Sequence, residues 1–573
     1  MRACAEFPTA ESRREESVKV KKKGTLRWIF DGAKRQTPLM LLLIVLNSLS
    51  AAVSVYFAVA IKNVIDSVLY QKGDSVTAIV VLFAAIVGEM GLRALCQYLD
   101  TRLRANLEIG YKSGLLKKIL QKDYSCMNFH SGELMNRFTG DAQIVSSSVA
   151  SLLPSLFSMG TRIVCIFWLL FHYDTVFTAV LCGAGLGMVV ITRLLRKKLK
   201  ALHKRVQETD GKWRSYVQEI LGHLPVVWVF GAQPQVSARS DRLQKDNLEA
   251  KLKRTKLHIA TGSGYSAVFN LAYAYTLIWG VFHLTDSFTY GTLTAMLDLI
   301  GQVQGPLLNL SGLVAQAAGL TASAERIMEI EALPERDTSA AVPRQMLEDC
   351  DFRFEARGLT FAYDREPVFD HANFEIRKGE FTVVAGASGI GKSTLFKLMM
   401  GLVTPQEGTL SLWCGGEETH AGSAWQGLLS YVPQGNLIFS GTVRENIAFA
   451  VPEADEESVR RAARLSCAEE FIDVLPDGLD TVIGERGFGL SEGQIQRLAI
   501  ARAILYDAPV FLLDEATSAL DETTERTVLE NLKSLGKTVV FISHKPAALA
   551  IADRLITVKD RKIAETTLEE NRA

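Results

Sequence analysis

The chain has 573 residues, in which 63 lysines and arginines are balanced by 63 aspartates and glutamates. This zero net charge argues against a nucleic-acid-binding protein, which normally carries a basic excess to meet phosphates. Hydrophobic residues make up 48% of the chain and charged residues 22%, a composition that excludes extensive disorder. At about 150 residues per domain, the length predicts roughly four domain-sized units.

The cysteines are scattered along the chain and form neither a CxxC pair nor a cluster with histidine. They lie at positions 4, 96, 126, 165, 182, 350, 414 and 467. We therefore expect neither a zinc site nor a disulfide framework. The simpler interpretation is that the cysteines act as small buried hydrophobic residues in a reducing environment.

The N-terminal half contains six apolar runs long enough to cross ~30 Å of hydrocarbon, which takes about 20 helical residues. The predicted transmembrane helices lie at about residues 37–61, 75–98, 148–171, 175–195, 260–283 and 287–313. The connections after the second and fourth helices are long and rich in lysine and arginine, whereas the other three are short. This positive-inside bias predicts that the N-terminus, the long connections and everything after the sixth helix are cytoplasmic.

No cleaved signal peptide or mitochondrial transit peptide is expected, because the polar segment 1–24 contains several glutamates and the first apolar run is too long for a signal peptide. The long connections keep a helical pattern, so we expect spans two to five to continue as cytoplasmic helices that reverse near residues 128–133 and 222–231. Within the spans, Glu89 and Arg93 are four residues apart, which favours an intrahelical pair. Arg162 and Asp298 either face a cavity or form a structural salt bridge.

The transmembrane domain is expected to cover residues 25–329. Residues 330–351 contain two prolines and mixed charges, as in a linker. From 352 to 573, apolar strand-like runs alternate with helical patterns, which predicts an α/β domain with a mainly parallel sheet. The predicted fold class is thus an all-α six-helix transmembrane domain with long cytoplasmic extensions, followed by an α/β P-loop nucleotide-binding domain.

A phosphate-binding loop follows a strand-like run. The strand FTVVA at 381–385 is followed directly by GASGIGKST at 386–394, which has the spacing GxxxxGK[ST]. The glycines permit backbone conformations that turn N–H groups onto phosphate oxygens, the lysine reaches the β- and γ-phosphates, and a serine hydroxyl binds Mg²⁺. The expected ligands are ATP and Mg²⁺, and the loop residues assigned to them are Gly386, Ser388, Gly389, Ile390, Gly391, Lys392, Ser393 and Thr394.

An acidic pair ends a second strand-like run, VFLLD. Asp514 suits a role at Mg²⁺, and Glu515 is placed to polarise an attacking water. Alone, such a pair would equally fit a helix N-terminal cap. Its position downstream of a phosphate loop favours the catalytic interpretation.

From about residue 25 onward, the chain closely resembles the exporter-type half-transporters of the ATP-binding cassette (ABC) family. Beyond the two nucleotide motifs, the resemblance is carried by SGELMNRFTGD at 131–141, LTFAYDREPVF with Tyr363, YVPQ ending at Gln434, GERG at 484–487, LSEGQIQR at 490–497, SALD at 518–521 and ISH ending at His544. So many motifs in the family order are very specific.

The resemblance implies roles for these residues. Tyr363 would stack on adenine, Gln434 would reach Mg²⁺, and His544 would bond the γ-phosphate. Two cassettes would pair head to tail, so that the signature residues Ser491, Gly493 and Gln494 and the D-loop Asp521 of one face the ATP of the other. The implied partner is a second half-transporter, either an identical chain or a related one.

One position departs from the family signature LSGGQ, because Glu492 takes the third place. A carboxylate near a γ-phosphate is unfavourable unless it points outward. Two alternatives remain open: a homodimer that tolerates Glu492, and a heterodimer in which Glu492 faces a weakened second site.

The resemblance implies ATP-driven export of an amphipathic small molecule, lipid or peptide by alternating access. The alternatives are uptake of a metal chelate by the same architecture, and an ATP-gated channel or regulatory subunit. Intact Glu515 and His544 count against a purely regulatory subunit. The expected location is the plasma membrane of a prokaryote, in contact with lipid and without nucleic acid.

Overall fold

The computed structural model describes the chain in segments and divides it into two compact units. The described residues are 22–124, 126, 129, 131–285, 288–336, 342–363, 367–420, 425, 427–435, 438–484 and 489–567. One unit comprises Met1–Leu120 and Phe129–Ala332, and the other Gln121–Asn128 and Leu333–Ala573. We call them the membrane unit and the nucleotide-binding unit.

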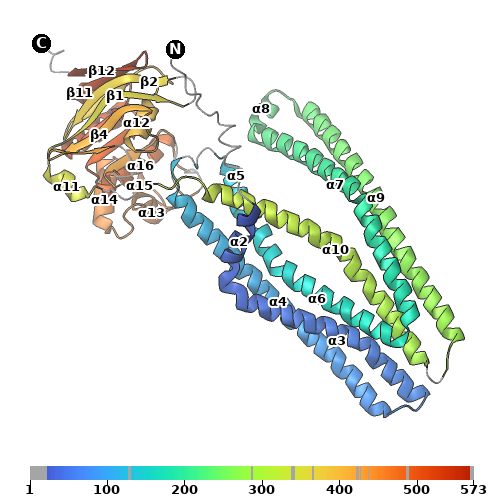
Figure 1. Cartoon of the computed structure of the whole chain (residues 1–573). Helices are drawn as coiled ribbons and strands as arrows, with labels where there is room; N and C mark the ends of the chain where they lie inside the picture. The colour runs from blue at the N-terminus through green and yellow to red at the C-terminus, as the bar shows by residue number, and fades with distance from the viewer. Residues whose placement is uncertain are drawn as a thin grey trace. The chain divides into compact units, whose positions relative to one another are not determined.

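Long helices dominate the membrane unit (Figure 1). They are α3 (Thr37–Leu69), α4 (Ser75–Gln121), α6 (Ala142–Tyr173), α7 (Thr175–Gly222), α9 (Gln233–Phe282) and α10 (Tyr290–Glu331). Shorter segments are α2 (Lys22–Ala33), η1 (Lys34–Gln36), α5 (Ser131–Asn136), the π-helical η3 (Arg137–Asp141) and α8 (Leu224–Val229). At 1.5 Å per residue, the 50 residues of α9 extend about 75 Å, more than twice the hydrocarbon thickness.

Three helical stretches of the described residues are long and apolar enough to cross a membrane: Gly24–Leu69, Ser75–Gln121 and Gly132–Tyr173. The remaining expected spans fall in α7, α9 and α10, which include residues whose side chains lie outside the described set.

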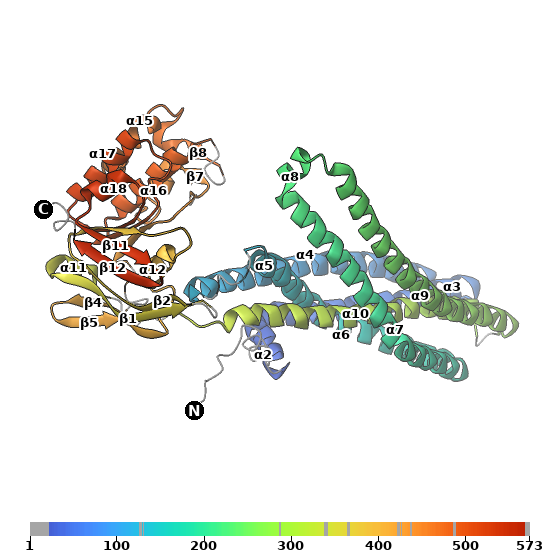
Figure 2. The same ribbon diagram turned by 90° about the horizontal axis from the view of Figure 1, so that it is seen from above.

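Apolar side chains from four helices form the core of this unit. Buried Val55 of α3, Ile166 of α6, Phe269 of α9 and Met296 of α10 belong to one cluster. Both views show α7 and α9 side by side, joined at one end through α8 (Figures 1 and 2). The chain therefore reverses within 222–231, as expected from the sequence. The earlier reversal starts sooner than expected, because α4 already ends at Gln121.

Polar contacts fix the segment that carries the SGELMNRFTGD motif. Asp141 is 1% exposed and accepts hydrogen bonds from Ser323 Oγ (2.8 Å) and Arg326 Nε (2.8 Å). Arg137 donates to Glu133 and to Glu329, at 2.7 and 2.8 Å. Since Ser323, Arg326 and Glu329 all belong to α10, the motif anchors this segment to the last long helix.

The intrahelical pair expected in α4 is confirmed, because Arg93 Nη2 contacts Glu89 Oε1. Asp298 accepts a hydrogen bond from Gln302 Nε2 at 2.8 Å, and the same nitrogen reaches the Ser54 carbonyl oxygen at 3.3 Å. Asp298 thus belongs to a polar contact between α10 and α3.

The nucleotide-binding unit is built on two larger sheets and a small one. A six-stranded sheet has the order β12-β11-β3-β10-β9-β6, and a four-stranded sheet the order β2-β1-β4-β5. The strands are β1 (Phe352–Ala362), β2 (Pro367–Arg377), β3 (Phe381–Ala385), β4 (Glu407–Cys414), β5 (Glu417–His420), β6 (Leu429–Val432), β7 (Gly441–Thr442), β8 (Val482–Ile483), β9 (Val510–Asp514), β10 (Thr538–Ile542), β11 (Arg554–Lys559) and β12 (Lys562–Thr567).

The helices of this unit cover the sheets. They are α11 (Arg344–Asp349), α12 (Lys392–Met399), α13 (Val443–Ile447), α14 (Glu456–Leu465), α15 (Glu469–Ile472), η5 (Gly478–Asp480), α16 (Glu492–Tyr506), α17 (Glu522–Ser534) and α18 (Pro546–Ile551).

Five neighbouring strands of the six-stranded sheet are parallel, and β12 is antiparallel at the edge. The parallel strands read as unbroken apolar runs because both of their faces are buried. Val383 and Val384 of β3 accordingly belong to cores on opposite faces. The sequence predicted this parallel sheet, whereas the four-stranded sheet is entirely antiparallel.

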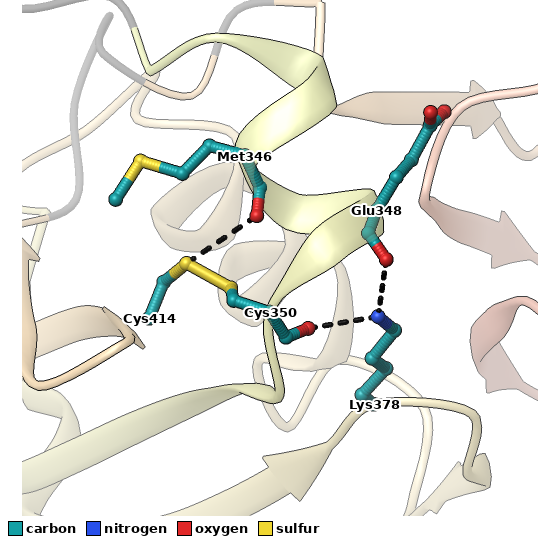
Figure 3. Close-up of a disulfide and its surroundings, with 5 residues drawn as sticks. All are labelled: Met346, Glu348, Cys350, Lys378 and Cys414. Carbon is teal, nitrogen blue, oxygen red and sulfur yellow. Dashed lines mark hydrogen bonds between the residues drawn. A yellow bond between two sulfur atoms is a disulfide. The ribbon is translucent and has the colours of Figure 1, made fainter.

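A disulfide joins Cys350, which directly follows α11, to Cys414 at the end of β4 (Figure 3). Their Cα atoms are 5.9 Å apart although 64 positions separate them in sequence. The expectation that no disulfide forms is therefore wrong, since only folding brings these two positions together. Lys378 Nζ donates to the carbonyl oxygens of Glu348 and Cys350, each at 2.8 Å, and so anchors the same turn. Of the other described cysteines, Cys96 and Cys126 are free and buried, as expected.

Two connecting segments run side by side in this unit. Asp123 N donates to the Pro334 carbonyl oxygen (3.1 Å) and Arg336 N to that of Gln121 (2.9 Å). Lys122 Nζ also donates to the Leu333 carbonyl oxygen at 2.8 Å. The segment after α4 is thus part of the nucleotide-binding unit.

Candidate nucleotide-binding site

The phosphate-loop sequence connects β3 to α12, and three of its glycines are required by the backbone. Gly386, Gly389 and Gly391 have φ of 152°, 79° and 114°, values that favour glycine. A Cβ at Gly391 would lie 2.3 Å from Val368 Cγ1, and one at Gly386 would lie 2.6 Å from the Val558 carbonyl oxygen. No side chain fits at either position.

Lys392 is buried and closes the loop on itself. Its Nζ donates to the carbonyl oxygens of Gly386 (2.7 Å) and Ala387 (3.1 Å). Ser388 and Ile390 lie within this loop, and Ile390 N donates to the Ala387 carbonyl oxygen at 3.4 Å. The loop leads into α12, whose N-terminal N–H groups make it suited to anions.

Asp514, at the end of β9, faces the start of α12. It is 3% exposed, and burial raises the pKa of its carboxyl group above the ordinary value. A hydrogen bond from Ser393 and the charge of Lys392 act in the opposite direction, while neighbouring Glu515 adds to the increase. Ser393 and Asp514 therefore lie together, as the two motifs predicted.

Glu515 is held in an unusual backbone conformation. Its φ is +50°, in the left-handed region that non-glycine residues rarely adopt. Its N–H donates to the Ile542 carbonyl oxygen of β10 (3.1 Å), and its Oε2 accepts a hydrogen bond from Gln434 Nε2 (2.7 Å). Such strain clusters at functional sites.

His544 follows β10 and is exposed. Because β3, β9 and β10 are parallel neighbours, the loop, the acidic pair and the histidine all follow the same edge of the sheet. The next residue, Lys545, donates to the carbonyl oxygens of Thr517 (2.7 Å) and Leu520 (3.1 Å) and pairs with Glu525. Sequence reasoning missed Lys545, which ties the histidine loop to the SALD segment.

The LSEGQ signature forms the start of α16. Ser491 is the N-cap: its Oγ accepts from Gln494 N, and its N–H donates to Gln494 Oε1 (2.8 Å), which completes a capping box. Glu492 is exposed in the first turn. A Cβ at Gly493 would lie 2.9 Å from the Ala519 carbonyl oxygen, so a side chain here would push against the SALD segment.

Gln496, also missed from the sequence, fixes that segment. It is 6% exposed, donates to Ser518 Oγ (2.8 Å) and accepts from Ala519 N (3.0 Å). Asp521 caps α17 by accepting from Thr524 N at 2.9 Å, and its hydrogen bonds with Thr523 and Thr524 lower its pKa. Of the GERG sequence, residues 485–487 lie outside the described residues.

Tyr363 belongs to a cluster of tyrosines around Lys397 of α12. Tyr363 Oη accepts weak hydrogen bonds from Thr394 Oγ1 (3.5 Å) and Lys397 Nζ (3.4 Å). Lys397 Nζ also lies 5.4 Å from the ring centroid of Tyr124, which comes from the segment after α4. Burial alone would lower the pKa of Lys397, but hydrogen bonds with the Tyr363 and Tyr124 hydroxyls raise it. Nothing in the local sequence pattern around Tyr124 signals this contact.

The domain has a glycine-rich loop between a buried strand and a helix. A buried aspartate and an adjacent glutamate lie at the same edge of the sheet. These features define a P-loop nucleotide-binding domain. Here that domain follows a helical membrane unit in one chain. The class is therefore a membrane-bound P-loop ATPase.

Comparison with known proteins identifies the family. Residues 39–307 match the model for the ABC transporter transmembrane region, and residues 369–518 match the ABC transporter model. The chain is 31% identical over 443 residues to the ATP-dependent lipid A-core flippase of Salmonella paratyphi A, which covers 76% of this chain and 75% of the relative. It is 28% identical over 537 residues to the protein of the same name from Escherichia coli strain K12, with 90% of each chain covered. The chain belongs to the ABC transporter family.

The fold agrees with this assignment. The structure of a bacterial Atm1-family ABC exporter with ATP bound matches with a TM-score of 0.78 at 22% identity, over 94% of this chain and 96% of that chain. The expected ABC exporter fold is thus confirmed, with a helical transmembrane domain followed by an α/β nucleotide-binding domain.

Proposed function

We propose that the chain uses ATP hydrolysis to move an amphipathic lipid across the membrane. The transport reaction is supported by the family and the exporter fold, and the lipid class by relatives named as lipid A-core flippases. One observation carries the ATPase assignment: Gln434 Nε2 holds Glu515 Oε2 at 2.7 Å, beside the Ser393–Asp514 pair.

The catalytic steps follow from this arrangement. Glu515 accepts the proton of the attacking water, because its carboxylate is fixed in direction by Gln434 and by its own constrained backbone. Lys392 exchanges its two carbonyl partners for phosphate oxygens when ATP binds. His544, exposed at the same sheet edge, donates to the γ-phosphate, and Tyr363 provides the ring on which adenine stacks.

Magnesium fits the donor set of the site. Ser393, Gln434 and Asp514 offer a hydroxyl, an amide and a carboxylate oxygen, the hard donors that this ion prefers. Among the described residues, no group of three or more histidine, cysteine or acidic side chains could hold a metal by itself. The ion would therefore be shared with the nucleotide phosphates, whose developing charge it neutralises.

The reaction requires two cassettes. The Ser491 N-cap and the first N–H groups of α16 suit a phosphate, and we assign them to the ATP that a second chain binds. These groups would meet the γ-phosphate bound to a second chain, with Gly493, Gln494 and Asp521 of the same surface beside them. We take the second chain to be identical, because Glu492 is exposed and can turn outward. A related chain with a more usual signature is the alternative.

We propose that two segments serve to couple the cassettes to the membrane unit. One is Tyr124, already packed against Lys397 beside Tyr363. The other is α8, the reversal between α7 and α9, where Trp228, Val229 and Phe230 are 61%, 83% and 78% exposed. An apolar tip this exposed suits a protein contact, and we assign it to a cassette. Both cassettes and the N-terminus would be cytoplasmic and the membrane the plasma membrane.

The test is ATP hydrolysis by the chain purified alone in lipid nanodiscs, with Glu515→Gln as the inactive control. Activity well above this control supports a working homodimer, whereas a folded, ATP-binding but inactive chain points to a missing second subunit. In proteoliposomes, ATP-dependent appearance of a labelled glycolipid in the opposite leaflet supports lipid transport.

The same vesicles separate the alternatives. ATP-dependent accumulation of a metal chelate without lipid movement would identify an importer. ATP-dependent ion conductance without cargo movement would identify a gated channel.

A further inference from the structure

The short helix α11 connects the disulfide to the end of α16, the helix that begins with the signature. It has six residues, Arg344–Asp349, and Cys350 is its C-cap. The bond to Cys414 ties this end of α11 to the last residue of β4 (Figure 3). Leu347 is buried, whereas the other residues of α11 are half-buried or exposed. Because a helix of this length is not stable by itself, its position depends on these anchors.

Arg344, at the start of α11, holds the C-terminal end of α16. Its Nη1 donates to the Tyr506 carbonyl oxygen at 3.1 Å, and its Nη2 donates to the Asp507 carbonyl oxygen. The same Nη2 lies 3.3 Å from Asp507 Oδ2. The last carbonyl groups of a helix have no partner within the helix, and a cation near them is favourable. Arg344 therefore supplies donors that α16 itself lacks.

The conformation of Asp507 makes this helix end sensitive to its partners. Asp507 is the C-cap of α16 and has a φ of +55°, a left-handed conformation that usually requires glycine. Its carboxylate pairs with Arg344 and, through Oδ1, with Lys537 at 3.2 Å. If Arg344 moves away, the strained cap loses an ion pair and two carbonyl groups lose a donor.

The helix α16 connects this end to the signature. It has 15 residues, about 22 Å in length, and its other end is the capping box of Ser491 and Gln494. A hydrogen-bonded helix transmits a displacement as a rigid element. The hold of Arg344 on one end therefore affects the position of Ser491 at the other.

The disulfide is the covalent anchor of this arrangement, and reduction removes it. Cys414 is 5% exposed and its sulfur lies 3.6 Å from the Met346 carbonyl oxygen, so a thiol there has a weak hydrogen bond in place of the covalent bond. Lys378 still donates to the carbonyl oxygens of Glu348 and Cys350. ATP is a cytosolic nucleotide, and a disulfide in the reducing cytosol is usually transient or redox-sensing.

We propose that the Cys350–Cys414 pair is a redox switch of ATP hydrolysis, and that Arg344 is the positioning residue through which it acts. In the bonded state α11 is fixed and Arg344 holds the end of α16. In the dithiol state the C-terminal end of α11 is released, and the signature is less well placed for a γ-phosphate. This inference rests on the proposed function, in which Ser491 meets the γ-phosphate bound to a second chain.

The oxidant is a low-molecular-weight disulfide such as glutathione disulfide. The thiolate of Cys350, the more exposed of the two cysteines, attacks one of its sulfurs, so that a mixed disulfide forms and one glutathione thiolate leaves. The Cys414 thiolate then attacks the Cys350 sulfur, which forms the intramolecular bond and releases the second glutathione thiolate. The two cysteines lose two electrons and two protons, and both are recovered in two glutathione thiols. An excess of glutathione reverses both steps.

The test measures ATP hydrolysis by the full-length chain in nanodiscs at different ratios of glutathione to glutathione disulfide, well below the unfolding midpoint of the reduced chain. Mass spectrometry after thiol alkylation gives the bonded fraction in the same samples. We expect the rate to follow the bonded fraction and to be about fivefold lower in the reduced chain, within the range typical of coupling residues. Binding of ADP should be unchanged, because ADP has no γ-phosphate and the phosphate loop is not part of the switch.

The variant Arg344→Gln separates the switch from simple destabilisation. It should lower the rate of the bonded chain to about that of the reduced chain, and reduction should then have little further effect. The matched control is Arg460→Gln on α14, since Arg460 has the same 37% side-chain exposure but pairs with Glu456 (3.0 Å) and Asp473 (3.2 Å). This control should keep the redox response. Cys414→Ser should behave as the reduced chain at every ratio.

Amide hydrogen exchange gives a readout that does not require hydrolysis. Exchange in α11 and at Asp507, whose N–H donates to the Ala503 carbonyl oxygen (3.2 Å), should be faster in the reduced chain. Equal and measurable hydrolysis rates in the two states, unchanged exchange on reduction, or a redox response that survives Arg344→Gln would each overturn the proposal. A chain whose exchange responds to reduction but whose hydrolysis does not exceed that of Glu515→Gln would contradict the proposed function instead.

Discussion

The side-chain amide of Gln434 donates a hydrogen bond to the carboxylate of Glu515, with 2.7 Å between Nε2 and Oε2. The two residues are 81 positions apart in sequence. They meet because each follows one of two neighbouring parallel strands, β6 and β9. The hydrogen bond therefore fixes the direction of the glutamate carboxylate. Orientation of a catalytic group in advance lowers the reorganisation needed in the transition state.

Replacement of the catalytic base tests this arrangement. Glu515→Gln should lower the ATP hydrolysis rate by about 100-fold or more, since a positioned general base contributes about 10²–10⁴. Binding of ATP should persist, because the phosphate loop is unchanged. Phosphate release and nucleotide binding measure the two effects. Glu522→Gln, an exposed position in the first turn of α17, serves as control, and an equal loss there would contradict the assignment.

The pH dependence of the site should be set by Asp514, whose pKa is raised by burial. Because the folded state binds this proton more tightly than the unfolded state, stability falls as pH rises from the ordinary pKa of 3.8 through the raised value. Hydrolysis should increase over the same interval, since only the ionised carboxylate suits Mg²⁺. Unfolding midpoints and rates against pH measure both trends. Asp514→Asn should remove this part of the stability slope, and an unchanged slope would exclude Asp514 as its source.

Gln496 should matter for both stability and turnover. Gln496→Leu removes the partner of Ser518 Oγ and of Ala519 N, and because these two residues are exposed, each lost hydrogen bond costs about 0.5–1.5 kcal/mol. The SALD segment would lose its position against α16, so hydrolysis should fall as well. Thermal unfolding and phosphate release test this. Gln207→Leu, at an exposed position of α7, should change neither quantity.

Reduction of the Cys350–Cys414 bond should destabilise the nucleotide-binding unit. For a loop of 64 positions, the chain-entropy relation gives about 4 kcal/mol at 25 °C. Dithiothreitol and Cys414→Ser should therefore lower the unfolding midpoint to the same extent, and the reductant should have no further effect on the variant. Cys467→Ser, at a free cysteine, is the control. Equal midpoints with and without reductant would show that the bond contributes nothing.

Tyr124 should affect coupling more than hydrolysis. Tyr124→Ala removes the ring from Lys397 but leaves the phosphate loop and Glu515 intact. We expect basal hydrolysis to stay within about twofold while ATP-driven lipid movement falls by about tenfold, a difference of about 1.4 kcal/mol. Parallel assays in one proteoliposome preparation give the ratio. Tyr216→Ala, on α7, is the control, and equal losses in both assays would argue against a coupling role.

Local sequence was sufficient for the phosphate loop, the acidic pair and the capped signature helix. In each case a few consecutive residues dictate the backbone, as Gly391 and Ser491 illustrate. The parallel strands were equally readable, because burial on both faces requires uninterrupted apolar runs.

Contacts between distant segments were not predictable in this way. The disulfide depends on how the end of α11 meets β4 in three dimensions. The residues next to each cysteine in the sequence do not indicate its partner. Gln496 and Lys545 resemble ordinary surface residues in sequence, yet both bind the SALD segment. Tyr124 lies about 240 positions before Tyr363, so the cluster around Lys397 appears only once the segment after α4 has folded onto the domain.

The closed phosphate loop also bears on nucleotide exchange. Since Lys392 bonds the carbonyl oxygens of Gly386 and Ala387, its buried ammonium is satisfied when no phosphate is present. Phosphate oxygens must therefore compete with two carbonyl oxygens of the loop for the N–H groups of this lysine. The contribution of this lysine to ATP binding is therefore the difference between its phosphate and carbonyl partners, to which the other contacts of the nucleotide are added.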